Sequence, residues 1–184
     1  ALVHAGAHLN VGIDIHWVDA PSIEKAGNAE AVLGDFDGVL IPGGFGKQGV
    51  EGMIAAVRYA RERGVPYLGL CYGMQIAICE FARTMCGLAG ADTSENAPDT
   101  PHPVITIIES QKETLAREGY GGTMRLGAYA AALEPGTLIH RIYTESGRVA
   151  ADRKKIESYR KNPAQHFRLG ILSEDNIPVV ERHR

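Results

Sequence analysis

The chain has 184 residues, of which 45% are hydrophobic and 22% are charged, and its formal net charge is −3. These values are typical of a soluble globular domain that can bury a core. The small negative charge gives no reason to expect a nucleic acid or a membrane as a partner, and no apolar run approaches the roughly 20 residues that span a bilayer.

Periodicity predicts strands and helices that alternate along the first half of the chain. The predicted strands are short apolar or alternating runs at 11–18, 36–41 and 65–70. The predicted helices cover 1–10 (the end of a longer helix), 50–63 and about 72–89, with a short helix or ordered loop at 23–32. This order predicts an α/β fold with a mostly parallel open sheet flanked by helices.

The sequence around Cys71 has the pattern of a nucleophile elbow. Gly69 and Gly73 flank Cys71 where the strand at 65–70 becomes a helix, and a tight strand-to-helix turn needs small residues at those places. A thiol at a helix N-terminus is favoured as thiolate, and the N–H of Tyr72 is placed to bind an oxyanion. A buried core cysteine is the competing interpretation, but it gives the two glycines no packing role.

The helix after Cys71 is predicted from apolar residues spaced at three to four positions, Met74, Ile78, Phe81 and Met85. Cys79 and Cys86 lie on the same pattern without metal-ligand spacing, so we expect both in the core and no metal site. Three cysteines, an odd number, favour a reducing compartment. Since the N-terminus also lacks the features of a signal peptide, we expect a cytoplasmic protein.

A glycine-rich segment, Pro-Gly-Gly-Phe-Gly at 42–46, follows the strand at 36–41. Its glycines permit positive φ and let backbone N–H groups approach a ligand, although a plain turn is an equally good interpretation. The Gly-Lys-Ser/Thr ending of a phosphate loop is missing. Because ligands of such sheets bind at the carboxyl ends of the strands, this segment and Cys71 could converge on one site.

The second half of the chain gives weaker patterns. Residues 90–103 are predicted to be a surface loop, in which Glu95 on its own is expected to be solvated. Strands are predicted at 104–108, 121–127 and 169–172, and a short helix at 138–143. The Lys- and Arg-rich residues 147–167 favour a solvated helix or a flexible insertion, with a binding site for anionic groups as the alternative.

Five runs of residues together resemble CTP synthases. They are Pro-Gly-Gly-Phe-Gly at 42–46, Gly-Val-Glu-Gly at 49–52, Gly-Leu-Cys-Tyr-Gly-Met-Gln at 69–75, Gly-Gly-Thr-Met-Arg-Leu-Gly at 121–127 and Glu-Arg-His-Arg at 181–184. The run at 69–75 alone resembles any class I glutamine amidotransferase. The runs at 121–127 and 181–184 make the resemblance specific to CTP synthases, in particular to their C-terminal class I (triad-type) glutaminase domain. The resemblance implies one glutaminase domain at 1–184, with a basic insertion at 147–167.

The resemblance implies that Cys71 attacks the amide of glutamine, forms a glutamyl thioester and thereby releases ammonia. The backbone N–H groups of Gly44 and Tyr72 are implied as an oxyanion hole, in which each donor contributes about 3–4 kcal/mol. Six residues are implied to contact glutamine: Gly44, Tyr72, Gly73, Met74, Gln75 and Glu95. The carboxylate of Glu95 suits the α-ammonium group of this substrate.

The same resemblance implies partners outside the chain, and no cofactor within the glutaminase domain. A synthetase domain of the same enzyme would use ATP and Mg²⁺ to activate UTP and would add the ammonia to make CTP. GTP is implied as activator and a homotetramer as the assembly. Lys-Gln at 47–48 replaces a commonly arginine-containing pair, a departure that bears on the response to GTP.

Further departures concern the catalytic machinery. None of the seven histidines is followed by Pro-Glu, so the His-Pro-Glu motif that supplies the family's base is absent, and the glutamine-binding Arg would fall two residues beyond Arg184. We therefore expect a domain truncated at both ends. We also expect that the chain by itself does not turn over glutamine, because a general base contributes roughly 10²–10⁴-fold. Tyr72 stands where the family usually has Leu.

Two alternatives remain beside the CTP synthase interpretation. The first is a class I amidotransferase that delivers ammonia to a different acceptor. The second is a catalytically degenerate regulatory or interaction domain, which the missing base favours.

Overall fold

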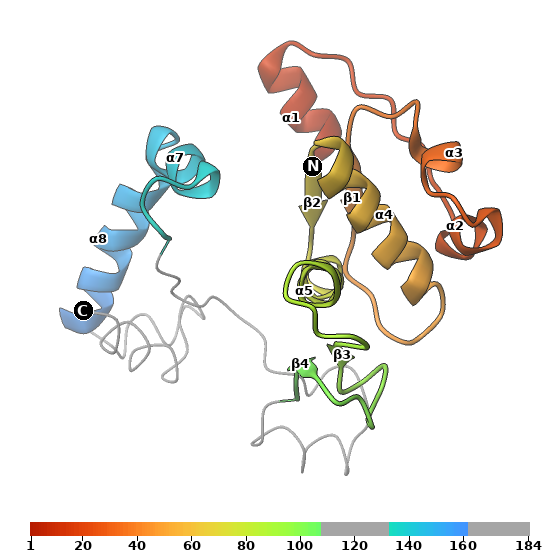
Figure 1. Cartoon of the computed structure of the whole chain (residues 1–184). Coiled ribbons are helices and arrows are strands. Elements are labelled where there is room, and N and C mark those ends of the chain that lie inside the picture. The colour runs from red at the N-terminus through yellow and green to blue at the C-terminus, as the bar shows by residue number, and fades with distance from the viewer. Residues whose placement is uncertain (108–132, 162–184) are drawn as a thin grey trace. The chain divides into compact units, whose positions relative to one another are not determined.

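The computed structural model describes residues 1–107 and 133–161 (Figure 1). They belong to two compact units, Ala1–Glu109 and Ser110–Arg184. The strands predicted at 121–127 and 169–172 and the run at 181–184 lie outside the described residues. That the chain is one glutaminase domain with an insertion stays a prediction.

The first unit begins with three helices, α1 (Leu2–Leu9), α2 (Ala20–Ala26) and α3 (Glu30–Leu33). Helix α1 ends at Leu9 and is capped by Asn10, which adopts a left-handed conformation with φ 55°. This confirms the helix predicted at the start of the chain. Helices α2 and α3 form where a short helix or ordered loop was predicted.

The strand predicted at 11–18 is wrong. These residues form neither helix nor strand, and their apolar side chains stay in solvent, with Trp17 91% exposed. A strand is stable only when its backbone groups pair with a neighbour. Within the described residues, no strand pairs with this segment. The alternation of apolar and polar residues is therefore not sufficient to form a strand here.

Two parallel strands, β1 (Val39–Ile41) and β2 (Tyr67–Gly69), carry the candidate site at their carboxyl ends. Parallel strands need a crossover connection, and here it contains helix α4 (Val50–Arg63), which ends at Gly64 with φ 69°. The helix predicted at 50–63 is confirmed residue for residue. The strand–helix–strand order also confirms the α/β prediction.

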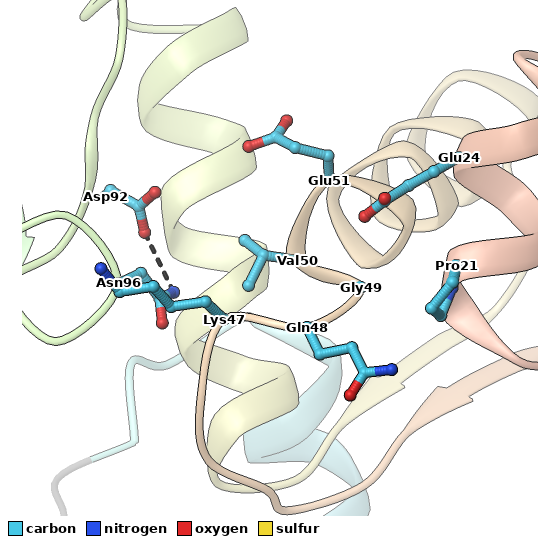
Figure 2. Close-up of a pocket in the computed structure, with 9 residues that line it drawn as sticks. All are labelled: Pro21, Glu24, Lys47, Gln48, Gly49, Val50, Glu51, Asp92 and Asn96. Carbon is cyan, nitrogen blue, oxygen red and sulfur yellow. Dashed lines mark hydrogen bonds between the residues drawn. The ribbon is translucent and has the colours of Figure 1, made fainter.

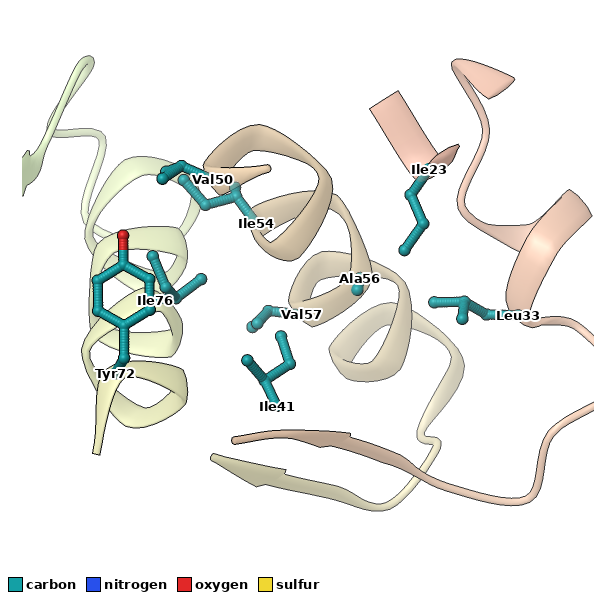
Figure 3. Close-up of a cluster of buried hydrophobic side chains, with 9 residues drawn as sticks. All are labelled: Ile23, Leu33, Ile41, Val50, Ile54, Ala56, Val57, Tyr72 and Ile76. Atoms are coloured by element: carbon teal, nitrogen blue, oxygen red, sulfur yellow. The ribbon is translucent and has the colours of Figure 1, made fainter. Parts of the chain in front are cut away.

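Helix α4 packs between α2 and α3 on one side and α5 (Tyr72–Thr84) on the other. Figure 3 shows Ile23 and Leu33 beside α4 on the first side and Ile76 of α5 on the other. Tyr72 at the start of α5 belongs to the same buried cluster. Burial of one large aliphatic side chain contributes roughly 1.5–3 kcal/mol. These contacts therefore hold the start of α5, which follows Cys71, in a fixed place beside β1.

The predicted helix after Cys71 is confirmed as α5, although it ends at Thr84 rather than near Ala89, and its apolar residues occupy two faces. Ile76 and Cys79 are buried. The four residues whose spacing predicted the helix lie on the opposite face and are 40–56% exposed: Met74, Ile78, Phe81 and Met85. Cys79 is a core residue as expected, whereas Cys86 is exposed, because the helix ends at Thr84 and Cys86 leaves its buried face.

Glu80 on α5 is a buried charge that α4 neutralises. Its side chain is 1% exposed, and it accepts hydrogen bonds from Nε and Nη2 of Arg61 at 3.0 and 2.8 Å. Burial alone would raise the pKa of Glu80, but the hydrogen bonds from Arg61 and Thr84, with the charges of Arg61 and Arg58, lower it. The resulting stability is present above the unfolded-state pKa and is lost as the pH falls through the folded-state pKa.

A second parallel pair, β3 (Asp92–Thr93) and β4 (Pro103–Ile105), brackets the segment predicted as a surface loop at 90–103. That prediction is only partly right, because Asp92, Thr93 and Asn96 are buried. Arg83 on α5 holds this segment by donating to the Ala91 carbonyl at 2.6 Å and to Asp92 at 2.8 Å. Strand β4 overlaps the start of the strand predicted at 104–108.

The described part of the second unit contains α7 (Leu138–Glu145) and α8 (Arg148–Lys161). The Thr137 hydroxyl oxygen accepts a hydrogen bond from the His140 N–H at 3.3 Å and caps α7, which confirms the helix predicted at 138–143. Helix α8 covers most of the basic segment predicted at 147–167. Among the described helices, none has the length and apolar character that crossing a membrane requires.

Candidate active site

Cys71 sits at a sharp turn between β2 and α5. Its backbone has φ 53° and ψ −104°, and within the described residues only Asn10 shares a positive φ without being glycine. Such a conformation costs of the order of 1–3 kcal/mol for a residue with a side chain, and strain of this kind is concentrated at functional sites. The turn leaves Cys71 exposed at the N-terminus of α5.

The two glycines beside Cys71 are required by close backbone contacts. A β-carbon at Gly69 would lie 2.6 Å from the backbone nitrogen of Met74. A β-carbon at Gly73 would overlap the carbonyl oxygen of Ile41 on β1. The small-x-nucleophile-x-small pattern therefore follows from packing of the first turn of α5 against both strands.

Three hydrogen bonds hold the turn at Cys71 against β1 and β2. The N–H of Leu70 donates to the Ile41 carbonyl at 2.9 Å, and the N–H of Gly73 donates to the Leu70 carbonyl at 3.0 Å. The Tyr67 hydroxyl donates to the Gly73 carbonyl at 2.7 Å. Burial raises the pKa of Tyr67 to about 12, so this hydroxyl stays a donor at neutral pH.

The glycine-rich segment at 42–46 lies against the turn, because β1 and β2 are parallel and end side by side. A β-carbon at Gly43 would lie 3.5 Å from Cβ of Cys71 and 4.0 Å from its sulfur. A β-carbon at Gly44 would lie 3.8 Å from the ring of Tyr72. The structure thus brings together the glycine segment and the cysteine turn that the sequence singled out.

Glu95 reaches the same segment from the loop after β3. Its Oε1 accepts a hydrogen bond from the Gly46 N–H at 3.2 Å, so Glu95 is half-buried rather than solvated. Met74 and Gln75 lie on the first turn of α5, with Met74 51% exposed and Gln75 half-buried.

Sequence reasoning missed the polar side chains that tie these parts together. The Tyr72 hydroxyl donates to the Gly46 carbonyl at 2.7 Å and to Oδ1 of Asn96 at 3.0 Å, and Nδ2 of Asn96 donates to Asp92 at 3.1 Å. A run of Asp, Thr, Ser, Glu and Asn predicts a solvated loop. This loop is buried because Arg83 lies beside it in the fold and pairs with Asp92, which the local sequence does not indicate.

A cavity of about 520 Å³ adjoins the glycine segment on the side of Lys47 and Gln48 (Figure 2). Its acidic lining residues already have partners: Glu24 accepts from the Gly52 N–H at 3.0 Å, and Arg83 pairs with both Glu51 and Asp92. Cys71 does not line this cavity. In the described parts of the chain, no group of three or more His, Cys, Asp or Glu residues is placed to hold a metal ion.

An exposed cysteine on a nucleophile elbow, beside a glycine segment that approaches it, defines an α/β domain of the cysteine-elbow class. The chain belongs to the family described as glutamine amidotransferase class-I, which it matches over residues 1–180. The resemblance inferred from the five sequence runs is thereby confirmed at the level of the family.

Individual relatives are more specific. The chain is 52% identical over 178 residues to a CTP synthase of Moorella thermoacetica, covering 97% of the chain and 32% of that protein. It is 50% identical over 164 residues to a CTP synthase of Methanothrix thermoacetophila, covering 89% of the chain and 29% of that protein. The chain therefore spans about a third of the length of these curated relatives.

A solved structure agrees with these relatives. The glutaminase domain of Trypanosoma brucei CTPS with bound acivicin superposes with a TM-score of 0.65 at 32% sequence identity. The match covers 76% of this chain and 52% of the T. brucei chain. The fold is thus that of a CTP synthase glutaminase domain.

Proposed function

We propose that this chain is the glutaminase part of a CTP synthase and that Cys71 is its nucleophile. The observation that carries the proposal is the strained, exposed position of Cys71 at the start of α5, with the glycine segment against its side chain. Similarity to CTP synthases supports glutamine as the substrate.

The proposed reaction forms and breaks one thioester. The Cys71 thiolate attacks the amide carbon of glutamine, the C–N bond breaks, and ammonia leaves after the nitrogen gains a proton. Water then cleaves the thioester to give glutamate. The negative oxygen of each tetrahedral intermediate would be held by the N–H groups of Gly44 and Tyr72, neither of which donates a hydrogen bond within the described residues.

The remaining proposed contacts hold the amino acid part of glutamine. The carboxylate of Glu95 would take the α-ammonium group, since its Oε2 has no partner in the described part of the chain. Backbone and side-chain atoms of Gly73, Met74 and Gln75 would line the same pocket, because all three belong to the first turn of α5.

The proposed destination of the ammonia lies in the rest of the enzyme. A synthetase domain would use ATP and Mg²⁺ to activate UTP, with GTP as activator, and four copies of the enzyme would assemble. The relatives named CTP synthase support this assignment over an amidotransferase with another acceptor. The three unpaired cysteines support a cytoplasmic location.

The 184-residue chain alone is expected to show no glutamine turnover at an enzymatic rate. Because the sequence contains no His-Pro-Glu motif, we expect this chain to lack the family's general base, and proton transfer by such a base contributes roughly 10²–10⁴-fold. Release of glutamate from glutamine, followed by a coupled assay, measures this directly. Turnover by the chain that disappears in Cys71→Ala would contradict the expectation.

In the enzyme that contains this chain, Cys71→Ala is expected to abolish CTP formation from glutamine but to leave CTP formation from added ammonia intact. The reason is that the thioester only supplies ammonia and takes no part in activation of UTP. Both rates are measured by the absorbance change on conversion of UTP to CTP, with Cys86→Ala as a control that keeps both. Equal rates from glutamine in Cys71→Ala and the unmodified enzyme would refute the assignment.

A further inference from the structure

The side chain of Tyr72 joins three parts of the candidate site. Tyr72 is 4% exposed as a residue, and its ring lies against Gly44 of the glycine segment. Its hydroxyl donates to the Gly46 carbonyl at 2.7 Å and to Oδ1 of Asn96 at 3.0 Å. The residue that follows the nucleophile is therefore bonded to the glycine segment and to the loop that carries Glu95.

The acceptors of this hydroxyl are held in fixed orientations. Nδ2 of Asn96 donates to Oδ1 of Asp92 at 3.1 Å, so its Oδ1 is turned toward Tyr72. Asp92 is in turn held by Arg83 at 2.8 Å. A phenol has one proton, so the two carbonyl oxygens share it. Burial raises the pKa of Tyr72, which keeps that proton in place at neutral pH.

Gly46 is held on both sides by this arrangement. Its N–H donates to Glu95 at 3.2 Å, and its carbonyl accepts from Tyr72 at 2.7 Å. Gly46 has φ 90°, a conformation that glycine tolerates but that other residues rarely adopt. Because glycine has little conformational preference of its own, these two hydrogen bonds orient its peptide groups. A displacement of Gly46 away from Tyr72 or Glu95 would break one of these two hydrogen bonds.

We propose that the Tyr72 hydroxyl is a positioning group, which holds the glycine segment and the loop of Glu95 in the arrangement that binds glutamine beside Cys71. This inference rests on the proposed function and deepens it. The hydroxyl itself does not touch the reacting atoms. It acts through Gly46, whose segment contains the proposed oxyanion donor Gly44, and through Asn96, the neighbour of Glu95.

The test compares two electrophiles on the enzyme that contains this chain. Acivicin needs a formed amino acid pocket as well as a thiolate, and iodoacetamide needs only the thiolate. The second-order rate constants for modification of Cys71 are measured for both by intact mass and peptide mapping. Tyr72→Phe, which keeps the buried ring, is expected to lower the acivicin-to-iodoacetamide ratio about five- to tenfold, the size of effect that one lost hydrogen bond produces.

Tyr67→Phe is the matched variant. It also removes a partly buried hydroxyl that donates to a backbone carbonyl at 2.7 Å, but that carbonyl belongs to Gly73 on the first turn of α5 and not to the glycine segment at 42–46. Tyr67→Phe should change the rate constants of both electrophiles by the same factor. The acivicin-to-iodoacetamide ratio of this variant should therefore equal that of the unmodified enzyme.

The outcomes separate this inference from the proposed function. A ratio in Tyr72→Phe equal to that of the unmodified enzyme, or an equal fall in both variants, would overturn the positioning role. An unmodified enzyme in which acivicin shows no preference for Cys71 over Cys79 and Cys86 would overturn the proposed function, and the positioning role with it.

Discussion

Gly73→Ala is expected to lower the free energy of unfolding by about 3 kcal/mol, the upper part of the range for overpacked sites, and to remove the selective reactivity of Cys71. The added β-carbon would overlap the carbonyl oxygen of Ile41. That oxygen belongs to β1 and also accepts the N–H of Leu70, so it cannot move without disturbing the turn. Chemical denaturation and the rate of acivicin modification measure the two effects.

Gly12→Ala is the matched control for this prediction. A β-carbon at Gly12 would meet no atom within 4 Å, and this glycine has no positive φ. We therefore expect a change in unfolding free energy of less than about 0.5 kcal/mol. If Gly73→Ala were as stable and as reactive as Gly12→Ala, the packing account of the turn would be wrong.

Arg83→Met is expected to lower the free energy of unfolding by about 2–3 kcal/mol, somewhat less than is lost when a fully buried ion pair is broken. The side chain of Arg83 is 19% exposed and that of Asp92 is 9% exposed, so the pair is largely shielded from water. Loss of Arg83 leaves Oδ2 of Asp92 and the Ala91 carbonyl without their donors. Thermal and urea unfolding of the chain measure the change.

Arg63→Met is the control for Arg83→Met. It tests whether the expected loss of unfolding free energy arises because the ion pair of Arg83 is buried, and not merely because a positive charge is removed. Arg63 pairs with Glu30 at 2.6 Å, but both side chains are at least half exposed, and exposed pairs contribute about 0–1 kcal/mol. A loss in Arg83→Met no larger than that in Arg63→Met would mean that the network around Asp92 does not hold the loop.

Local sequence determines helix α4 and the cysteine turn, and both were predicted correctly. The end of α4 at Gly64 depends on a residue that tolerates φ 69°. The turn depends on Gly69 and Gly73, which meet backbone atoms close by in the fold. In each case, the residue type itself carries the constraint.

Features that depend on distant residues were not predictable in the same way. The strand expected at 11–18 has the right alternation, but its existence depends on a partner that the sequence pattern does not specify. The sequence of the loop after Ala91 predicts a solvated segment. Its burial depends on Arg83, which bonds to Ala91 and Asp92 from eight and nine positions earlier in the chain. Likewise, the role of the Tyr72 hydroxyl depends on Gly46 and Asn96, 26 and 24 positions away.

The central claim is that Cys71 is a glutamine-reactive nucleophile, and covalent modification by acivicin tests it most directly. The thiolate would displace chloride and form one C–S bond, which intact mass and peptide mapping locate. We predict a single modification at Cys71, slowed by excess glutamine and absent in Cys71→Ala. Modification of Cys71 no faster than that of Cys86, with no protection by glutamine, would contradict the account.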